Sequence, residues 1–264
     1  MIREPAVAGT FYPADPDALR QVVRAYLEEG RRRMQDAGAV APKALIAPHA
    51  GYVYSGPIAG SAYATIEPLR DRIERVVLIG PSHHVAFHGI ALSSATSWRT
   101  PLGDVPLDRA GAAALAKLPQ VRVFDAAHAD EHSLEVQLPF LQETLGRFEL
   151  LPLVAGDASP HEVAQVLDRA WGGPETLIVV SSDLSHYYEQ AMARSLDRIA
   201  TAAIEALRPE GLDEHSACGR VPIRGLLVAA RQHGCAVRTL DLRNSGDTAG
   251  PRDRVVGYGA YAFG

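Results

Sequence analysis

Histidines and one aspartate follow three short apolar segments of the chain. The segment ALIAPH ends at His49, VVLIGPSHH ends at the pair His83 and His84, and IVVSSDLSH contains Asp183 and His186. Imidazole nitrogens and carboxylate oxygens bind transition metals, and a neutral imidazole also transfers protons near neutral pH. One histidine in such a place is usually a satisfied polar residue. Three segments that end alike indicate one shared site.

A thiol precedes the expected start of a helix near Pro222. Cys218 is followed by Gly219 and Arg220. A helix N-terminus and the Arg220 guanidinium both favour the thiolate over the thiol, and a thiolate binds soft metals. Cys218 is therefore a candidate ligand, whereas Cys235 is interpreted as a small buried hydrophobe.

A fourth cluster contains the spacing of an inverted zinc peptidase motif. The segment HADEH reads H-x-x-E-H from His128 through Glu131 to His132. Such enzymes need both histidines on one helical face. Glu131 is expected in the first turn of a helix over about 131–145, which leaves His128 before that helix. A zinc hydrolase that uses His128, Glu131 and His132 is therefore a minor alternative.

The elements that must position these residues follow from the hydrophobic pattern. Apolar runs without polar alternation suit strands buried on both faces of a parallel sheet, and they span 44–47, 76–79, 150–154 and 177–180. Helical patterns separate them or precede them, over 16–34, 57–68, 131–145, 160–170 and 188–207. The alternation predicts an α/β fold with a mostly parallel central sheet flanked by helices. Sites in such sheets lie at the carboxyl ends of the strands, so the histidines are expected to converge.

Composition limits the class of protein. The 264 residues are 47% apolar and no Gly-, Ser- or Pro-rich linker divides them, so 1–264 is expected to form a single domain. The tail over 255–262 alternates and is expected to be an antiparallel or edge strand. A net charge of −5 predicts no nucleic-acid or membrane-surface partner. No long apolar segment or apolar leader is present and the two cysteines form no disulfide framework, so a cytoplasmic protein is expected.

Eight segments, in order along nearly the whole chain, resemble the Memo-like proteins. They are AGTFYPADP, APHAGYVYSGPIAG, GPSHH, TPLGDVPLD, DEHSLEVQLPFLQ, SSDLSHY, CGRVPIRGLL and NSGDTAG…RVVGYGAYAF. The resemblance implies a fold similar to the class III extradiol ring-cleaving dioxygenases (LigB-like). By family context it also implies an AmmeMemoRadiSam modification pathway with radical-SAM and AMMECR-type partner proteins.

The resemblance also implies roles for single residues. His49, His83 and Cys218 lie where the family places metal ligands. Asp183 and His186 lie where it lines the same pocket, and His186 matches the acid/base histidine of the dioxygenases. Both are therefore predicted catalytic residues. Asp183 is expected to orient His186, or else to cap a helix near 185–188.

The motif EHS adds two further pocket residues, Glu131 and His132, and Arg220 is predicted to belong to the same pocket. The dioxygenases hold Fe(II) with two histidines and a carboxylate, whereas this chain has Cys218 in the third place. Iron is the predicted metal, with copper or zinc as alternatives. The predicted function is a metal-dependent, dioxygenase-like oxidoreductase acting on a small-molecule or peptide substrate. The alternative is a non-enzymatic metal- or phosphopeptide-binding protein or redox scaffold.

Overall fold

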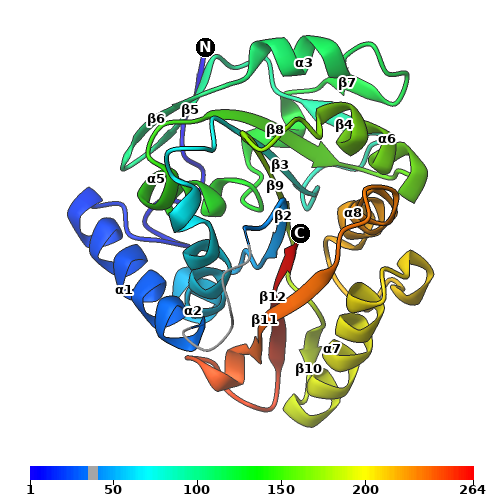
Figure 1. Cartoon of the computed structure of the whole chain (residues 1–264). Coiled ribbons are helices and arrows are strands. Elements are labelled where there is room, and N and C mark those ends of the chain that lie inside the picture. The colour runs from blue at the N-terminus through cyan, green and yellow to red at the C-terminus, as the bar shows by residue number, and fades with distance from the viewer. Residues whose placement is uncertain (35–40) are drawn as a thin grey trace.

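A mixed sheet forms the centre of the computed structural model, which describes residues 1–34 and 41–264 (Figure 1). Its strands are β2 (Ala44–Ala47), β3 (Arg75–Pro81), β4 (Ile90–Leu92), β7 (Val121–Val123), β8 (Glu149–Ala155), β9 (Thr176–Ser181), β10 (His186–Tyr188), β11 (Val237–Asn244) and β12 (Val255–Phe263). Within the described residues their order is β10-β12-β2-β9-β3-β8-β4-β7, and β11 pairs with β12. A second sheet has the order β1-β5-β6 and consists of β1 (Ile2–Arg3), β5 (Ser97–Thr100) and β6 (Gly103–Pro106).

The predicted apolar runs form the parallel centre of the sheet. Strands β2, β9, β3 and β8 are parallel neighbours. Antiparallel pairs flank them, because β12 runs against β2, β10 and β11, and β4 runs against β8. The C-terminal strand is antiparallel, as expected, but it lies between β10 and β2 instead of at an edge. The predicted α/β fold is confirmed, with its parallel pairing concentrated at the centre.

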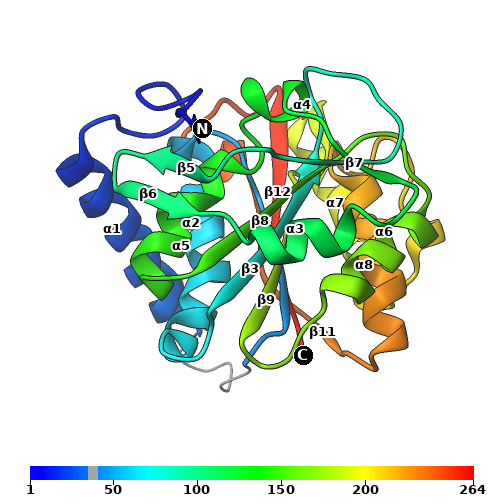
Figure 2. The ribbon, with the colours of Figure 1, turned by 90° about the horizontal axis from the view of Figure 1, so that it is seen from above.

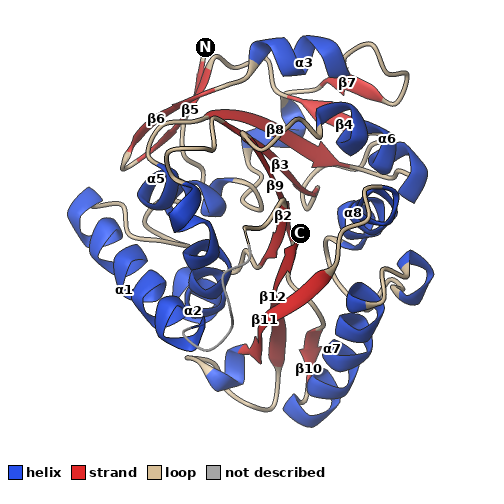
Figure 3. Cartoon of the chain, in the orientation of Figure 1, coloured by secondary structure: helices blue, strands red, loops and turns tan. Residues whose placement is uncertain are grey.

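Helices cover both faces of the sheet (Figures 2 and 3). They are α1 (Pro16–Met34), α2 (Tyr52–Tyr63), α3 (Arg109–Leu115), α4 (Ala126–Ala129), α5 (Leu138–Leu145), α6 (Pro160–Ala170), α7 (Gln190–Glu205) and α8 (Arg220–Gln232). Alternate strand residues point to opposite faces. Leu45 and Val179 pack with α1, α2 and α5, whereas Ile46 and Val180 pack with α6, α7 and α8. The strands read as continuous apolar runs because both faces are covered.

The predicted helix over 131–145 begins later than expected. Helix α5 starts only at Leu138, after a 3₁₀ turn over Glu135–Gln137, and Pro139 lies in its first turn. Proline lacks an N–H and suits that position. The Glu131 carboxylate accepts the backbone N–H of Ser133, and this bond belongs to a turn instead of a helix. Among the described residues, no helix combines the length and apolar character needed to cross a membrane.

Candidate metal centre

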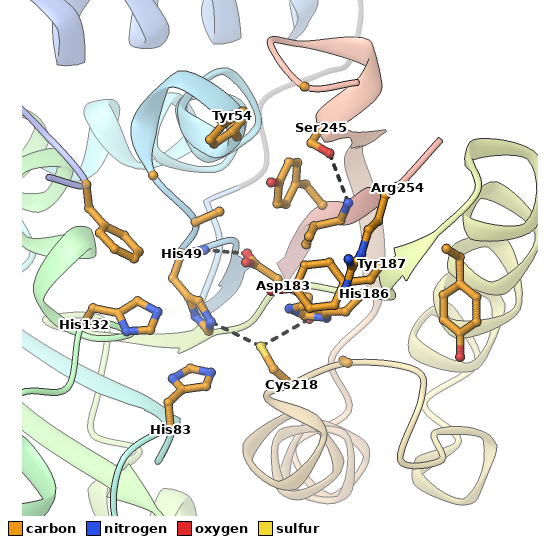
Figure 4. A pocket seen from close by; sticks show the side chains of 18 of the residues that line it. His49, Tyr54, His83, His132, Asp183, His186, Tyr187, Cys218, Ser245 and Arg254 are labelled. Atoms are coloured by element: carbon orange, nitrogen blue, oxygen red, sulfur yellow. Dashed lines mark hydrogen bonds between the residues drawn. The ribbon is translucent and has the colours of Figure 1, made fainter. Parts of the chain in front are cut away.

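Three histidines from separate segments meet at the carboxyl end of the sheet (Figure 4). His49 follows β2, His83 follows β3, and His132 lies in the turn between α4 and α5. One ligand atom from each lies within 4.8 Å of the others. The His83 and His132 rings stack with centroids 4.7 Å apart, and His49 meets both rings edge-on. This group could hold a metal ion.

Cys218 adjoins the three histidines. It was the predicted third metal ligand beside His49 and His83, but the residue that the structure groups with these two is His132. Its Sγ lies 3.2 Å from Nε2 of His49. Gly219 permits this approach, because a Cβ at that position would lie 2.6 Å from the Cβ of Ser182. The predicted thiolate is not favoured in the protein alone, since burial and the nearby Asp183 raise the pKa of the Cys218 thiol. A cation at the histidines would reverse that preference.

Ser181 fixes the tautomer of His49. Its Oγ lies 2.9 Å from Nδ1 of His49, donates to the carbonyl of Ser133 at 2.5 Å and accepts the Gln137 amide N–H at 2.8 Å. A hydroxyl has only one hydrogen to donate. Nδ1 of His49 is therefore the donor, and Nε2 carries the lone pair on the side that faces Cys218.

Glu131 fixes His83 in the same way. Its carboxylate accepts the backbone N–H of His83 at 2.6 Å and lies 2.8 Å from Nδ1 of the same residue. Burial by itself would raise the pKa of Glu131, but the hydrogen bonds from His83 and Ser133 outweigh it and lower the pKa to about 2. The ionised carboxylate can only accept, so Nδ1 of His83 carries the hydrogen and Nε2 is left for a ligand bond.

The environment keeps two of the imidazoles neutral. Burial lowers the pKa of His49 well below its usual value, and burial together with His83 lowers the pKa of His132 to about 4. A neutral imidazole offers a lone pair, which a metal requires. Nitrogen and sulfur donors fit iron, copper or zinc and do not fit magnesium or calcium, which prefer oxygen.

Asp183 and His186 contact the site differently from the prediction. Asp183 Oδ1 accepts the backbone N–H of His49 at 2.7 Å, and burial raises the pKa of Asp183 to about 6. His186 Nδ1 lies 2.8 Å from the carbonyl of Leu184, so Nδ1 donates and Nε2 keeps its lone pair. Among the hydrogen bonds of the described residues, none joins Asp183 to His186, and strand β10 follows instead of a helix. Asp183 therefore fixes the turn that carries His49.

These side chains line one open cavity of about 770 Å³. The residues that carry chemistry are His49, His83, His132, Asp183, His186 and Cys218. Aromatic side chains form much of the remaining wall, and they are Phe11, Tyr54, Tyr187, Tyr188 and Tyr258. A cavity of this size suits a small organic molecule.

Three of the predicted site residues do not line this cavity. Glu131 lies behind His83, and Arg220 lies in the first turn of α8. His128 is buried elsewhere, with Nε2 3.2 Å from the carbonyl of Ala91 and its ring edge-on to Trp98. Helix α4 ends at Ala129, so the H-x-x-E-H residues share no helix. The zinc hydrolase therefore lacks one of its two histidine ligands among the described residues.

Sequence reasoning missed two residues that hold the ligands, Ser181 and Gln137. Ser181 is the last residue of β9, between β2 and β3, so its place at the strand end was a usable signal. Gln137 reaches the site only because the turn before α5 folds it back onto Ser181. No sequence spacing shows such a contact.

Comparisons with known proteins agree on one family. A model of the family described as Memo-like protein matches residues 3–262. A MEMO1 family protein of Aquifex aeolicus is 38% identical over 97% of each chain, and one of Methanopyrus kandleri is 37% identical over 100% of this chain and 99% of its own. The crystal structure of an uncharacterised Escherichia coli K12 protein shares the fold, with a TM-score of 0.56 and 13% identity over 83% of this chain and 98% of that one. The chain therefore belongs to the Memo-like family.

Proposed function

We propose that the cavity is a metal-dependent active site and that the protein is an oxidoreductase acting on a small organic molecule. The supporting observation is the convergence of His49, His83 and His132 on an open cavity, with Cys218 Sγ 3.2 Å from His49 Nε2. Iron is the metal we propose, because the chain resembles the class III extradiol dioxygenases, and copper and zinc are the alternatives.

Some residues of the cavity would hold the metal, and another would transfer a proton. A bound metal would supply Lewis-acid and redox chemistry. The three histidines would hold it, and Cys218 is a further ligand candidate. His186 Nε2 takes a proton from the substrate, since Nδ1 is committed to the Leu184 carbonyl. Asp183 keeps the His49 turn in place through the His49 backbone N–H.

Metal analysis of protein purified without a histidine tag tests the metal centre. The pair His83→Ala and His84→Ala is matched, because both residues are exposed neighbours and only His83 belongs to the group. His83→Ala is expected to lose most bound metal and His84→Ala to keep it. His132→Ala and Cys218→Ser then show which side chain completes the ligand set. Equal metal content in the His83 and His84 variants would sink the assignment.

Oxygen uptake tests the activity. The protein is loaded with Fe(II) without oxygen and then exposed to oxygen with a panel of catechols and other aromatic compounds. Uptake that falls at least tenfold in His186→Gln, with metal content unchanged, supports the oxidoreductase. Bound metal without uptake on any compound would favour the non-enzymatic binding or redox-scaffold function.

A further inference from the structure

We propose that Arg254 and Tyr187 form an anion subsite in the cavity wall, which binds the carboxylate of a small aromatic acid. The subsite itself rests on the geometry of these two residues. The statement that the bound acid is the substrate rests on the proposed function, because the rest of the acid would then lie toward the histidines.

Arg254 is a cation with no counter-ion among the described residues. It lies directly before β12 and lines the same cavity as the histidines. Its guanidinium carbon lies 4.7 Å from the centroid of the Tyr187 ring (Figure 4). Within residues 1–34 and 41–264, no carboxylate lies within ion-pair distance of it, whereas Arg3, Arg99 and Arg243 are each paired. A guanidinium stacked on a ring keeps its N–H edge available for a planar carboxylate.

Tyr187 is held in an unfavourable backbone conformation to make this contact. Its φ is +65°, a left-handed value that residues with a Cβ rarely adopt. His186 pairs with Val256 and Tyr188 with Val255, so Tyr187 is the extra residue of a bulge between β10 and β12. Bulges redirect side chains beside functional sites.

The Tyr187 ring gains little burial in return. Tyr187 is 63% exposed, and its ring contacts both the Arg254 guanidinium and the His186 ring, whose centroid is 5.6 Å away. Strain without core packing is the kind of outlier that marks a binding role. The ring therefore connects the cation to the proton-transfer histidine across one wall of the cavity.

The rest of the cavity favours an aromatic body for the ligand. Phe11, Tyr54, Tyr188 and Tyr258 line it, and their faces and edges accept a planar ring. The acidic residues of the wall do not neutralise Arg254. Asp183 bonds the His49 backbone, and Glu214 lies 3.6 Å from its neighbour His215. A phosphate shares the oxyanion chemistry of a carboxylate, so the test must separate the two.

Ligand titration followed by NMR or calorimetry tests the subsite with the full chain. The probes are benzoate, phenylacetate and 3-phenylpropanoate, with benzyl alcohol as the neutral match and phenyl phosphate as the second oxyanion. At least one carboxylate is expected to bind about tenfold more tightly than the alcohol, and Arg254→Gln is expected to remove that preference. Arg252→Gln is the control, because Arg252 is exposed, two residues away and outside the cavity wall.

Tyr187 variants test the ring separately from the fold. Tyr187→Phe is expected to keep the preference for carboxylates. Tyr187→Gly removes the ring and also the strain at φ +65°, so it is expected to lose about as much binding as Arg254→Gln without a lower unfolding midpoint. A fall in the midpoint with carboxylate binding intact would show that the ring only stabilises the fold.

Two results would overturn the subsite. One is equal binding of the acids and benzyl alcohol, and the other is an equal loss in the Arg252 and Arg254 variants. Arg254-dependent binding of phenyl phosphate alone would overturn the carboxylic-acid assignment. Metal content is measured in the same samples and is expected to stay at the wild-type level in Arg254→Gln. Failure of the metal centre would appear in the histidine variants, and failure of the subsite in the comparison of acid with alcohol.

Discussion

Two buried glutamates lie four residues apart in the segment DEHSLEVQ and serve different parts of the molecule. Glu131 is 1% exposed and bonds the backbone and ring of His83. Glu135 is 0% exposed and accepts from Arg3 at 2.5 Å, from the Tyr12 hydroxyl at 2.6 Å and from two backbone N–H groups near the N-terminus. One carboxylate holds a candidate metal ligand, and the other fastens the N-terminal segment to the core.

The two glutamates have different roles because their hydrogen-bond partners differ, since their residue type and burial are the same. Glu135 faces the buried cation Arg3, so removal of the carboxylate leaves an unpaired charge. Glu131 bonds the ring and backbone of His83 and the backbone N–H of Ser133 and pairs with no Lys or Arg among the described residues, so its removal mainly frees the ring of His83. We therefore expect stability to depend on Glu135 and metal affinity to depend on Glu131.

The largest effect is expected for Glu135→Ala. Arg3 would lose its buried counter-ion, and the free energy of unfolding is expected to fall by about 3–5 kcal/mol, measured by denaturant unfolding. Metal affinity of the folded protein is expected to stay within a factor of two to three. A stable variant, or one that loses metal as strongly as Glu131→Gln, would contradict the division between the two glutamates.

Glu131→Gln is expected to weaken metal binding by about 10- to 100-fold, because ligands of this kind depend on the groups that orient them. The loss of unfolding free energy is expected to be only about 1–2 kcal/mol, since the amide oxygen still accepts one N–H. Competition with a chelator gives the affinity, and denaturant unfolding gives the stability. Unchanged affinity would leave Glu131 as a turn-forming residue.

Asp197 extends the comparison to a buried carboxylate that pairs with no cation in the part of the chain that the structure describes. It accepts the backbone N–H of Ser185 at 3.0 Å, and burial raises its pKa to about 6. The folded state therefore resists ionisation of Asp197, and stability is lost as the pH rises from about 4, where the unfolded carboxyl ionises, to about 6. Relative to Asp197→Asn, the wild type is expected to lose about 2 kcal/mol over that interval and to change little above pH 7.

Unfolding curves of both proteins at several pH values measure this difference. Asn is a suitable replacement because its amide oxygen can still accept from Ser185. A difference in stability that does not vary between pH 4 and 7 would show that Asp197 ionises normally in the folded protein.

The smallest effect is expected for Ser181→Ala. Ser181 is an uncharged residue that orients His49 as Glu131 orients His83. His49 would lose the partner that fixes its Nδ1–H tautomer, and metal affinity is expected to fall by about three- to tenfold. Nitrogen-15 NMR of His49 in metal-free protein is expected to show Nδ1–H in the wild type and a mixture in the variant. Ser61→Ala is the control, because Ser61 is equally buried and bonds Asp241 instead. A wild-type tautomer in Ser181→Ala would remove this role.

The hydrophobic pattern was enough to predict the parallel centre of the sheet and the chemistry at its edge. The apolar runs of β2, β3, β8 and β9 have no polar alternation because helices cover both of their faces. Burial on both faces can therefore be recognised from each short segment alone. His49 and His83 follow from it, since they come directly after β2 and β3, which both run parallel to the strand between them, β9. The interior position of β12 was not predicted, although its antiparallel direction was, because pairing between distant strands leaves no local signal.

The sequence by itself determined the fold class, the family resemblance and the candidate residues, because these depend on residue type and spacing. Only the tertiary structure decided their partners. In the folded chain, His132 lies beside the other two histidines, Glu131 bonds His83, and Asp183 bonds the His49 backbone. Burial raises the pKa of the Cys218 thiol. The physical reason is that hydrogen bonds act over about 3 Å, whereas two residues that they join at this site, His49 and Asp183, lie 134 positions apart in the sequence.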